Sequence, residues 1–175
     1  MHKPINIDLF RYCPSCGSKG ILFDGVKELR CQTCSFTYFH NSAAAVGIIL
    51  EYGDQILLIK RNNEPSKGKL DLPGGFVDPN ESVEEAAKRE VREELNMELG
   101  MLKYLGSQPN TYEYKGVTYK TCDLFFSSRI DTIPTDLDKT EIKELILVSR
   151  SEIPLEEIAF ESTKKMLRFL KNEIE

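Results

Sequence analysis

The chain has 175 residues and a formal net charge of −5, and this charge excludes a strongly basic protein that coats nucleic acid. Its hydrophobic residues (41%) and charged residues (29%) are in the proportion of a soluble globular protein with one main core. No apolar run approaches the ~20 residues of a membrane span, and the first residues lack the apolar core of a signal peptide. We therefore expect a cytoplasmic protein whose partner is neither a membrane nor a nucleic acid.

Two C-x-x-C pairs lie near the start of the chain, with fourteen residues between them. In a cytosolic protein this spacing predicts a tetrahedral zinc site with four thiolate ligands, Cys13, Cys16, Cys31 and Cys34. The alternatives are disulfides, which suit the compartment poorly, and a redox pair, which does not need a matched second copy. We predict a zinc ribbon over residues 1–40 that depends on the metal for folding. Its short strands are expected at residues 21–23 and 36–39.

Residues 41–175 are predicted to form one α/β domain. An alanine-rich and β-branched strand at residues 42–50 reads as central, and a turn at Gly53-Asp54 leads into a second strand at residues 55–60. The fold class that we predict is an α/β/α sandwich around a mixed sheet. Further strands are expected at residues 101–107, 112–114, 117–130 and 144–148, and an amphipathic helix at the end carries Thr163, Met166, Leu167 and Leu170 on one face. Cys122, in one of these strands, is predicted to be inert and buried.

A helix is predicted to begin after Ser82, because Glu85 three residues later completes a capping box, and to end near Asn96. At about 100° per residue, its core-facing stripe is apolar in the first half and acidic in the second. The acidic half consists of Glu90, Glu93 and Glu94. Three carboxylates so close together repel one another unless a divalent cation such as Mg²⁺ or Mn²⁺ lies between them. A solvated acidic face is the alternative.

Residues 75–97 read G-F-V-D-P-N-E-S-V-E-E-A-A-K-R-E-V-R-E-E-L-N-M. This segment resembles the Nudix box, G-x5-E-x7-R-E-U-x-E-E-x-G-U with U a bulky aliphatic residue, and Asn96 is the only departure. Asparagine is the commonest substitute for glycine in the left-handed conformation, so we expect function to survive the change. The positions in register are Gly75, Glu81, Arg89, Glu90, Val91, Glu93, Glu94 and Met97.

The resemblance implies Mg²⁺-dependent hydrolysis of the pyrophosphate bridge in a nucleoside diphosphate linked to another group. Glu90, Glu93 and Glu94 would hold the metal and act in catalysis with Arg89, while Glu81 has a supporting role. Arg89 lies four residues from both Glu85 and Glu93, so we expect it to neutralise these two carboxylates.

The turn before the helix and a later loop contribute further candidates. Gly74 and Gly75 allow the sharp turn from strand to loop that is expected to face the substrate. Glu141 precedes a strand where relatives often place a metal-binding or proton-accepting glutamate, and Glu144 is a lesser candidate. A solvated charge in a polar loop is the alternative for Glu141.

The substrate is suggested by a resemblance to one branch, the NADH pyrophosphatases. Those enzymes also carry a four-cysteine ribbon before the Nudix domain and a motif S-Q-P-W-P-F-P-x-S, of which only Ser107-Gln108-Pro109 is present here. We therefore expect Gln108, Tyr112 and Tyr114 to contact the substrate, the tyrosines by stacking on a base; hairpin packing is the alternative role for the tyrosines.

An NADH-like dinucleotide is the first choice of substrate, and ADP-ribose or another nucleoside diphosphate sugar is the second. A nucleotide sensor without activity is the alternative from a different class, although such domains usually lose box glutamates and this chain keeps them all. The resemblance also implies a homodimer.

Overall fold

The computed structural model describes residues 10–172, so residues 1–9 of the predicted ribbon lie outside the described part. The chain divides into two compact units. One contains residues up to Ala43 together with Thr111–Lys120, and the other contains Ala44–Asn110 and the residues from Thr121 onward. The domain boundary between residues 40 and 41 stays a prediction.

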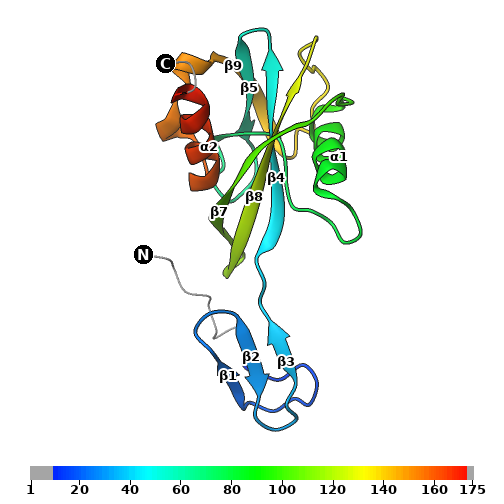
Figure 1. Ribbon diagram of the computed structural model, residues 1–175, viewed down its shortest axis with the longest axis vertical. Helices are drawn as coiled ribbons and strands as arrows, with labels where there is room; N and C mark the ends of the chain where they lie inside the picture. The colour runs from blue at the N-terminus through cyan, green and yellow to red at the C-terminus, as the bar shows by residue number, and fades with distance from the viewer. Residues whose placement is uncertain (1–9, 173–175) are drawn as a thin grey trace. The chain divides into compact units, whose positions relative to one another are not determined.

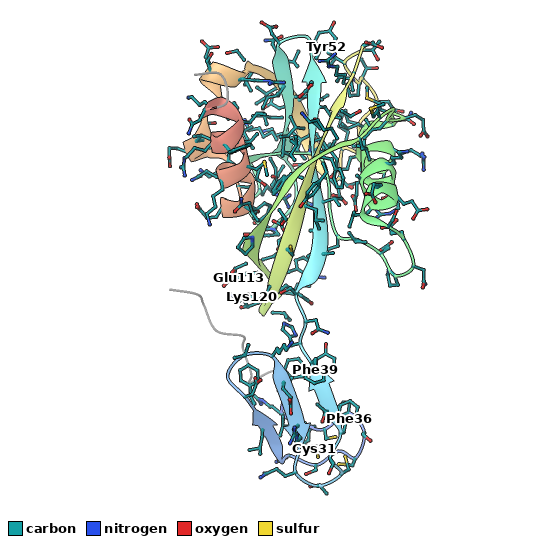
Figure 2. The ribbon with its side chains drawn as sticks, viewed as in Figure 1. Cys31, Phe36, Phe39, Tyr52, Glu113 and Lys120 are labelled. Atoms are coloured by element: carbon teal, nitrogen blue, oxygen red, sulfur yellow. The ribbon has the colours of Figure 1, made fainter. Side chains whose placement is uncertain are left out.

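The cysteine-containing segment forms a three-stranded antiparallel sheet in the order β1-β2-β3. β1 (Ile21–Phe23) and β3 (Thr37–Phe39) agree with the predicted strands. β2 (Glu28–Cys31) was not predicted, because its charged residues conceal an alternation that buries Leu29 and Cys31. The sulfur atoms gather at the end of this sheet near Cys31 (Figure 2).

The second unit is built on a six-stranded sheet in the order β6-β5-β4-β8-β7, with β9 paired to β5. β4 and β5 form the predicted hairpin, in which Tyr52 pairs with Gln55. The N–H of Ile130 donates to the carbonyl of Glu51 (2.9 Å), so the ends of β8 and β4 adjoin and these two strands run in the same direction. The sheet is therefore mixed. Its strands are β4 (Ala43–Tyr52), β5 (Gln55–Arg61), β6 (Leu70–Asp71), β7 (Lys103–Tyr114), β8 (Val117–Arg129) and β9 (Ile142–Ser149). The adjoining ends of β7 and β8, within Thr111–Lys120, are grouped with the first unit.

Two helices cover opposite faces of this sheet, α1 (Val83–Leu95) and α2 (Glu161–Asn172), as Figure 1 shows. Successive residues of β4 point to opposite faces: Ile48 packs in the cluster under α1, and Ile49 in the cluster under α2. This arrangement confirms the α/β/α sandwich. Two short 3-10 helices, η2 (Arg150–Glu152) and η3 (Leu155–Glu157), precede α2. Within the described range, no helix has both the length and the apolar character needed to cross a membrane.

Two predictions about the later strands were wrong. The strands expected at residues 101–107 and 112–114 are one continuous strand, β7, which tolerates Pro109 because it lies at the edge of the sheet. Cys122 is exposed rather than buried. Its neighbours Thr121 and Asp123 are buried, and side chains alternate along a strand, so Cys122 faces the other way.

Candidate functional site

The acidic helix begins and ends where the sequence predicts. The N–H of Glu85 donates to Ser82 Oγ (3.2 Å), and the N–H of Ser82 donates to Glu85 Oε2 (2.7 Å), which completes the capping box. Asn96 closes the helix in the left-handed conformation, with φ 48° and ψ 42°. The positions of the box glutamates on α1 are therefore fixed by local signals.

Glu94 is a buried carboxylate, with 5% of its surface exposed. The N–H of Gly74 donates to Glu94 Oε2 (3.0 Å), and it is the one hydrogen-bond donor that the described residues give this side chain. Burial raises the pKa of Glu94 well above its ordinary value, and the negative charge of Glu90 raises it further. Such a group is costly to ionise unless a cation approaches it.

The glycine turn is shaped around these carboxylates. Gly74 has a φ of 142°, and a Cβ there would lie 2.1 Å from the carbonyl oxygen of Val46. A Cβ on Gly75 would lie 2.5 Å from Glu90 Oε1. The clash at position 74 is with backbone, so only glycine lets the loop lie against β4 there, whereas a side chain at position 75 would require the Glu90 carboxylate to move.

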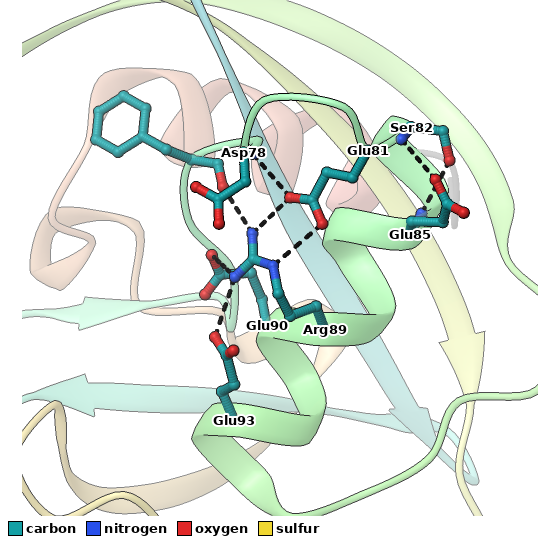
Figure 3. A network of polar contacts seen from close by, with 8 residues as sticks. Asp78, Glu81, Ser82, Glu85, Arg89, Glu90 and Glu93 are labelled. Atoms are coloured by element: carbon teal, nitrogen blue, oxygen red, sulfur yellow. Dashed lines mark hydrogen bonds and ion pairs between the residues drawn. The ribbon is translucent and has the colours of Figure 1, made fainter.

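Arg89 connects the carboxylates of the box (Figure 3). Its Nε and Nη2 donate to the two oxygens of Glu81 (3.1 and 2.7 Å), and its Nη1 donates to Glu90 (2.9 Å) and to Glu93 (3.0 Å). Nη2 also donates to the carbonyl of Phe76 (3.0 Å). Five donated hydrogen bonds from one guanidinium fix the relative positions of the loop and the helix.

One predicted partner of Arg89 was wrong. Glu93 contacts it as expected, but the carboxylate of Glu85 accepts from the N–H of Ser82 in the capping box. Glu81 takes its place, because the loop before the helix brings that side chain back over the guanidinium. Sequence spacing along a helix does not reveal a partner that lies outside it.

The carboxylates suit a hard divalent cation by their chemistry, with oxygen ligands only and two of them withdrawn from water. The three carboxylates do not lie as close to one another as the four cysteine sulfurs do. Arg89 forms ion pairs with Glu90 and Glu93, and the side chain of Glu93 is 60% exposed. Burial also raises the pKa of Glu90, although the adjacent Arg89 counteracts this. Glu90, Glu93 and Glu94 are therefore a candidate magnesium site.

The two later glutamates, Glu141 and Glu144, are both exposed but differ in their surroundings. The negative charge of Glu141 raises the pKa of both Glu90 and Glu94. Glu144 instead forms an ion pair with Lys60 (2.9 Å) on the neighbouring strand, and this contact lowers its pKa. Glu141 therefore stays the first candidate for the additional acidic residue, because its loop is hydrogen-bonded to α1 through the carbonyl of Glu94 (2.9 Å from the nitrogen of Asp138), whereas Glu144 is paired with Lys60.

The predicted substrate residues beyond the glycines lie on β7. Gln108 is half-buried there. Tyr112 and Tyr114 lie in the segment that belongs to the cysteine-containing unit, with their ring centroids 6.4 Å apart. Lys115 lies over the ring of Tyr114, 4.9 Å from its centroid. A contact between these three residues and a substrate stays a prediction.

The four cysteines form a separate candidate metal centre. Their sulfur atoms all lie within 4.8 Å of one another, and they are the one group of three or more metal-ligand side chains that comes this close among residues 10–172. The distances Cys13 Sγ–Cys34 Sγ and Cys16 Sγ–Cys31 Sγ are both 3.7 Å. This is much longer than a disulfide of about 2.05 Å and close to the edge of about 3.8 Å that a tetrahedron with Zn–S bonds of about 2.3 Å has.

Backbone N–H groups favour a thiolate on Cys31, whereas the neighbouring cysteine sulfurs raise the pKa of Cys16 to about 12. The pKa of Cys31 is lowered to about 6, because the backbone N–H groups of Cys34 and Thr33 point toward its sulfur. Thiolates rather than thiols bind metals. All four cysteines are free, so the disulfide alternative is not observed.

Comparison with known proteins places this chain in a family. A NAD-capped RNA hydrolase, NudC, of Pseudomonas fluorescens is 35% identical over 98 residues, which are 56% of this chain and 35% of that protein. An ADP-ribose pyrophosphatase of Methanocaldococcus jannaschii is 53% identical over 60 residues, which are 34% of this chain and 35% of that protein. The chain spans only about a third of the length of these curated relatives.

Solved structures agree with the fold. A NUDIX hydrolase from Nitrosomonas europaea superimposes with a TM-score of 0.65 at 26% identity, over 93% of this chain and 91% of that one. A MutT NUDIX hydrolase from Burkholderia pseudomallei gives a TM-score of 0.63 at 25% identity, over 73% of this chain and 97% of that one. The NUDIX domain matches residues 41–170, and the chain belongs to this family.

Proposed function

We propose that this chain is a hydrolase that depends on a divalent metal ion and cleaves the pyrophosphate bond of a nucleoside diphosphate linked to another group. The observation that carries the proposal is the buried carboxylate of Glu94, held by the N–H of Gly74 beside Glu90. A carboxylate withdrawn from water beside a second one is unfavourable by itself. It is favourable where a cation and a diphosphate complete the site.

Each residue of the site has a proposed task. Glu90, Glu93 and Glu94 would hold Mg²⁺ or Mn²⁺, which when bound neutralises charge on the pyrophosphate oxygens and lowers the pKa of water. Arg89 orients Glu90 and Glu93 through its hydrogen bonds. Glu141 would accept the proton of the attacking water, and the hydrogen bond from its loop to the carbonyl of Glu94 supports this role.

The substrate that we propose first is an NADH-like dinucleotide. The NudC relatives carry names that refer to an NAD cap on RNA, and the four-cysteine ribbon of this chain resembles that branch. Because of those names, we add NAD-capped RNA, in which the same kind of diphosphate is linked to RNA, as a candidate substrate. The net charge of the chain had led us to expect no nucleic-acid partner. ADP-ribose is the second candidate, because a shorter region is 53% identical to an ADP-ribose pyrophosphatase.

A substrate panel tests the proposal. Purified protein is incubated with Mg²⁺ and NADH, an NAD-capped oligonucleotide, ADP-ribose or diadenosine polyphosphates, and the released mononucleotide is quantified. We expect turnover of at least one compound, abolished by a chelator and restored by Mg²⁺ or Mn²⁺. Tight nucleotide binding without turnover of any compound would instead favour the sensor.

The four cysteines are proposed to hold one structural zinc ion, in keeping with their sulfur–sulfur distances. The homodimer and the cytoplasmic location, which follow from the family resemblance and the sequence, stay predictions.

A further inference from the structure

The loop that carries Glu141 is attached to the end of helix α1 at two points. Asn96 Nδ2 donates to Asp136 Oδ2 (2.9 Å), and the N–H of Asp138 donates to the carbonyl of Glu94 (2.9 Å). Asn96 is the one residue that departs from the Nudix pattern, which has glycine at this position. Glycine allows the same backbone conformation but has no side chain with which to make the first contact.

The same loop is held from a second direction by Asn62, which follows β5. Asn62 Nδ2 donates to the carbonyl of Lys139 (2.7 Å), and the Asn62 N–H donates to the carbonyl of Glu141 (2.7 Å). Glu141, the proton acceptor of the proposed function, is thus held through its own backbone.

The loop is also ordered internally by Asp138. Its Oδ1 accepts from both the N–H (2.8 Å) and the hydroxyl (2.7 Å) of Thr140, and its carbonyl accepts from the N–H of Ile142 (2.8 Å). These local bonds define the conformation of the turn. Its position relative to α1 is therefore set by the attachments at Asn96, Glu94 and Asn62.

We propose that Asn96 is a positioning residue, which with Asp136 holds the Glu141 loop against helix α1 so that Glu141 reaches the metal cluster. We call this Asn96–Asp136 contact the clasp. The inference rests on the proposed function, because it assigns Glu141 to the same metal site. Asn96, the one departure from the family pattern, then has a function through its side chain. This goes beyond the ability of asparagine to adopt the left-handed conformation.

The test restores the family residue with Asn96→Gly. Glycine is favoured in this conformation, so thermal stability should be retained. Loss of a hydrogen bond worth about 0.5–1.5 kcal/mol corresponds to roughly a twofold to tenfold effect. We expect Mn²⁺ affinity, measured by titration with paramagnetic detection, to fall by this factor, and kcat on the best substrate to fall with it.

Matched variants separate the clasp from a general change in structure. Asp136→Ala should weaken Mn²⁺ binding as much as Asn96→Gly, whereas Asp136→Asn keeps an acceptor oxygen and should behave as the wild type. Because the clasp acts through Glu141, Asn96→Gly should have no further effect in a Glu141→Gln background.

Three results would overturn the inference. They are an Asn96→Gly variant with wild-type Mn²⁺ affinity and kcat, an equal loss in the Glu141→Gln background, and a Glu141→Gln variant that changes neither quantity. A failure of the proposed function is distinguishable, because a wild-type protein without turnover on the whole panel would disprove that function while the Mn²⁺ titrations still report on the clasp.

Discussion

Replacing Glu94 with glutamine is expected to change stability and activity in opposite directions. This carboxylate is 5% exposed and has the N–H of Gly74 as its donor. Glutamine keeps the shape and an acceptor oxygen for that N–H, and it removes the buried negative charge. We expect Glu94→Gln to raise the free energy of unfolding by on the order of 1–3 kcal/mol, the cost of a poorly compensated buried polar group.

The direction in which the free energy of unfolding changes with pH follows from the raised pKa of Glu94. The folded protein binds a proton on Glu94 more tightly than the unfolded chain does, because the pKa is raised on folding. The wild-type free energy of unfolding therefore falls as pH rises from the ordinary carboxyl range through the raised pKa. The stability advantage of Glu94→Gln should grow with pH over that window and disappear in acid.

The assay is thermal unfolding in a chelator from pH 4 to pH 8, where each kcal/mol moves Tm by roughly 2–4 °C for a chain of this size. Adding Mg²⁺ should raise the Tm of the wild type and leave the variant unchanged. Turnover by the variant should fall at least ~10²-fold, the scale of losing one preorganised electrostatic contact. Glu84→Gln, which changes an exposed glutamate on the same helix, is the control and should alter neither property.

The reasoning would be refuted by near-normal turnover in Glu94→Gln. It would also be refuted by a variant that is less stable than the wild type at pH 8 without metal, because the buried charge would then be well compensated.

Two further predictions concern the other charged and metal-binding groups. Arg89→Lys keeps the charge but replaces five donated hydrogen bonds with a single ammonium, so we expect the free energy of unfolding to fall by about 1–3 kcal/mol. Urea unfolding measures this change. An unchanged unfolding midpoint would contradict the bridging role of Arg89. Wild-type protein should contain close to one zinc per chain by elemental analysis, and the double change Cys31→Ser with Cys34→Ser should remove both the zinc and the ordered β1-β2-β3 sheet. A metal-free variant with intact amide-exchange protection in that sheet would contradict the zinc assignment.

Several parts of the fold follow from local sequence signals. The bounds of α1 were predicted because Ser82, Glu85 and Asn96 act on backbone groups within one turn of themselves. The β4–β5 hairpin was predicted because Gly53 and Asp54 separate two apolar strands. In each case the residues that give the signal and the residues that respond to it are neighbours in the chain.

Other features could not be predicted, because their partners are distant in the sequence. The exposure of Cys122 depends on which face of β8 is covered, and the choice of Glu81 over Glu85 by Arg89 depends on the path of the preceding loop. Strand β2 was missed because its charged residues hide two buried positions, Leu29 and Cys31.

The family pattern, the acidic stripe of α1 and the matched cysteine pairs could be predicted before folding was considered, since each depends on residue types at fixed spacing. The folded structure added the hydrogen bond from the N–H of Gly74 to Glu94 and the ion pair of Glu144 with Lys60. It also decided that Asn96 contacts Asp136. These contacts join segments that are far apart in the chain, and the distance between such segments is set by packing of the sheet against its helices rather than by local propensity.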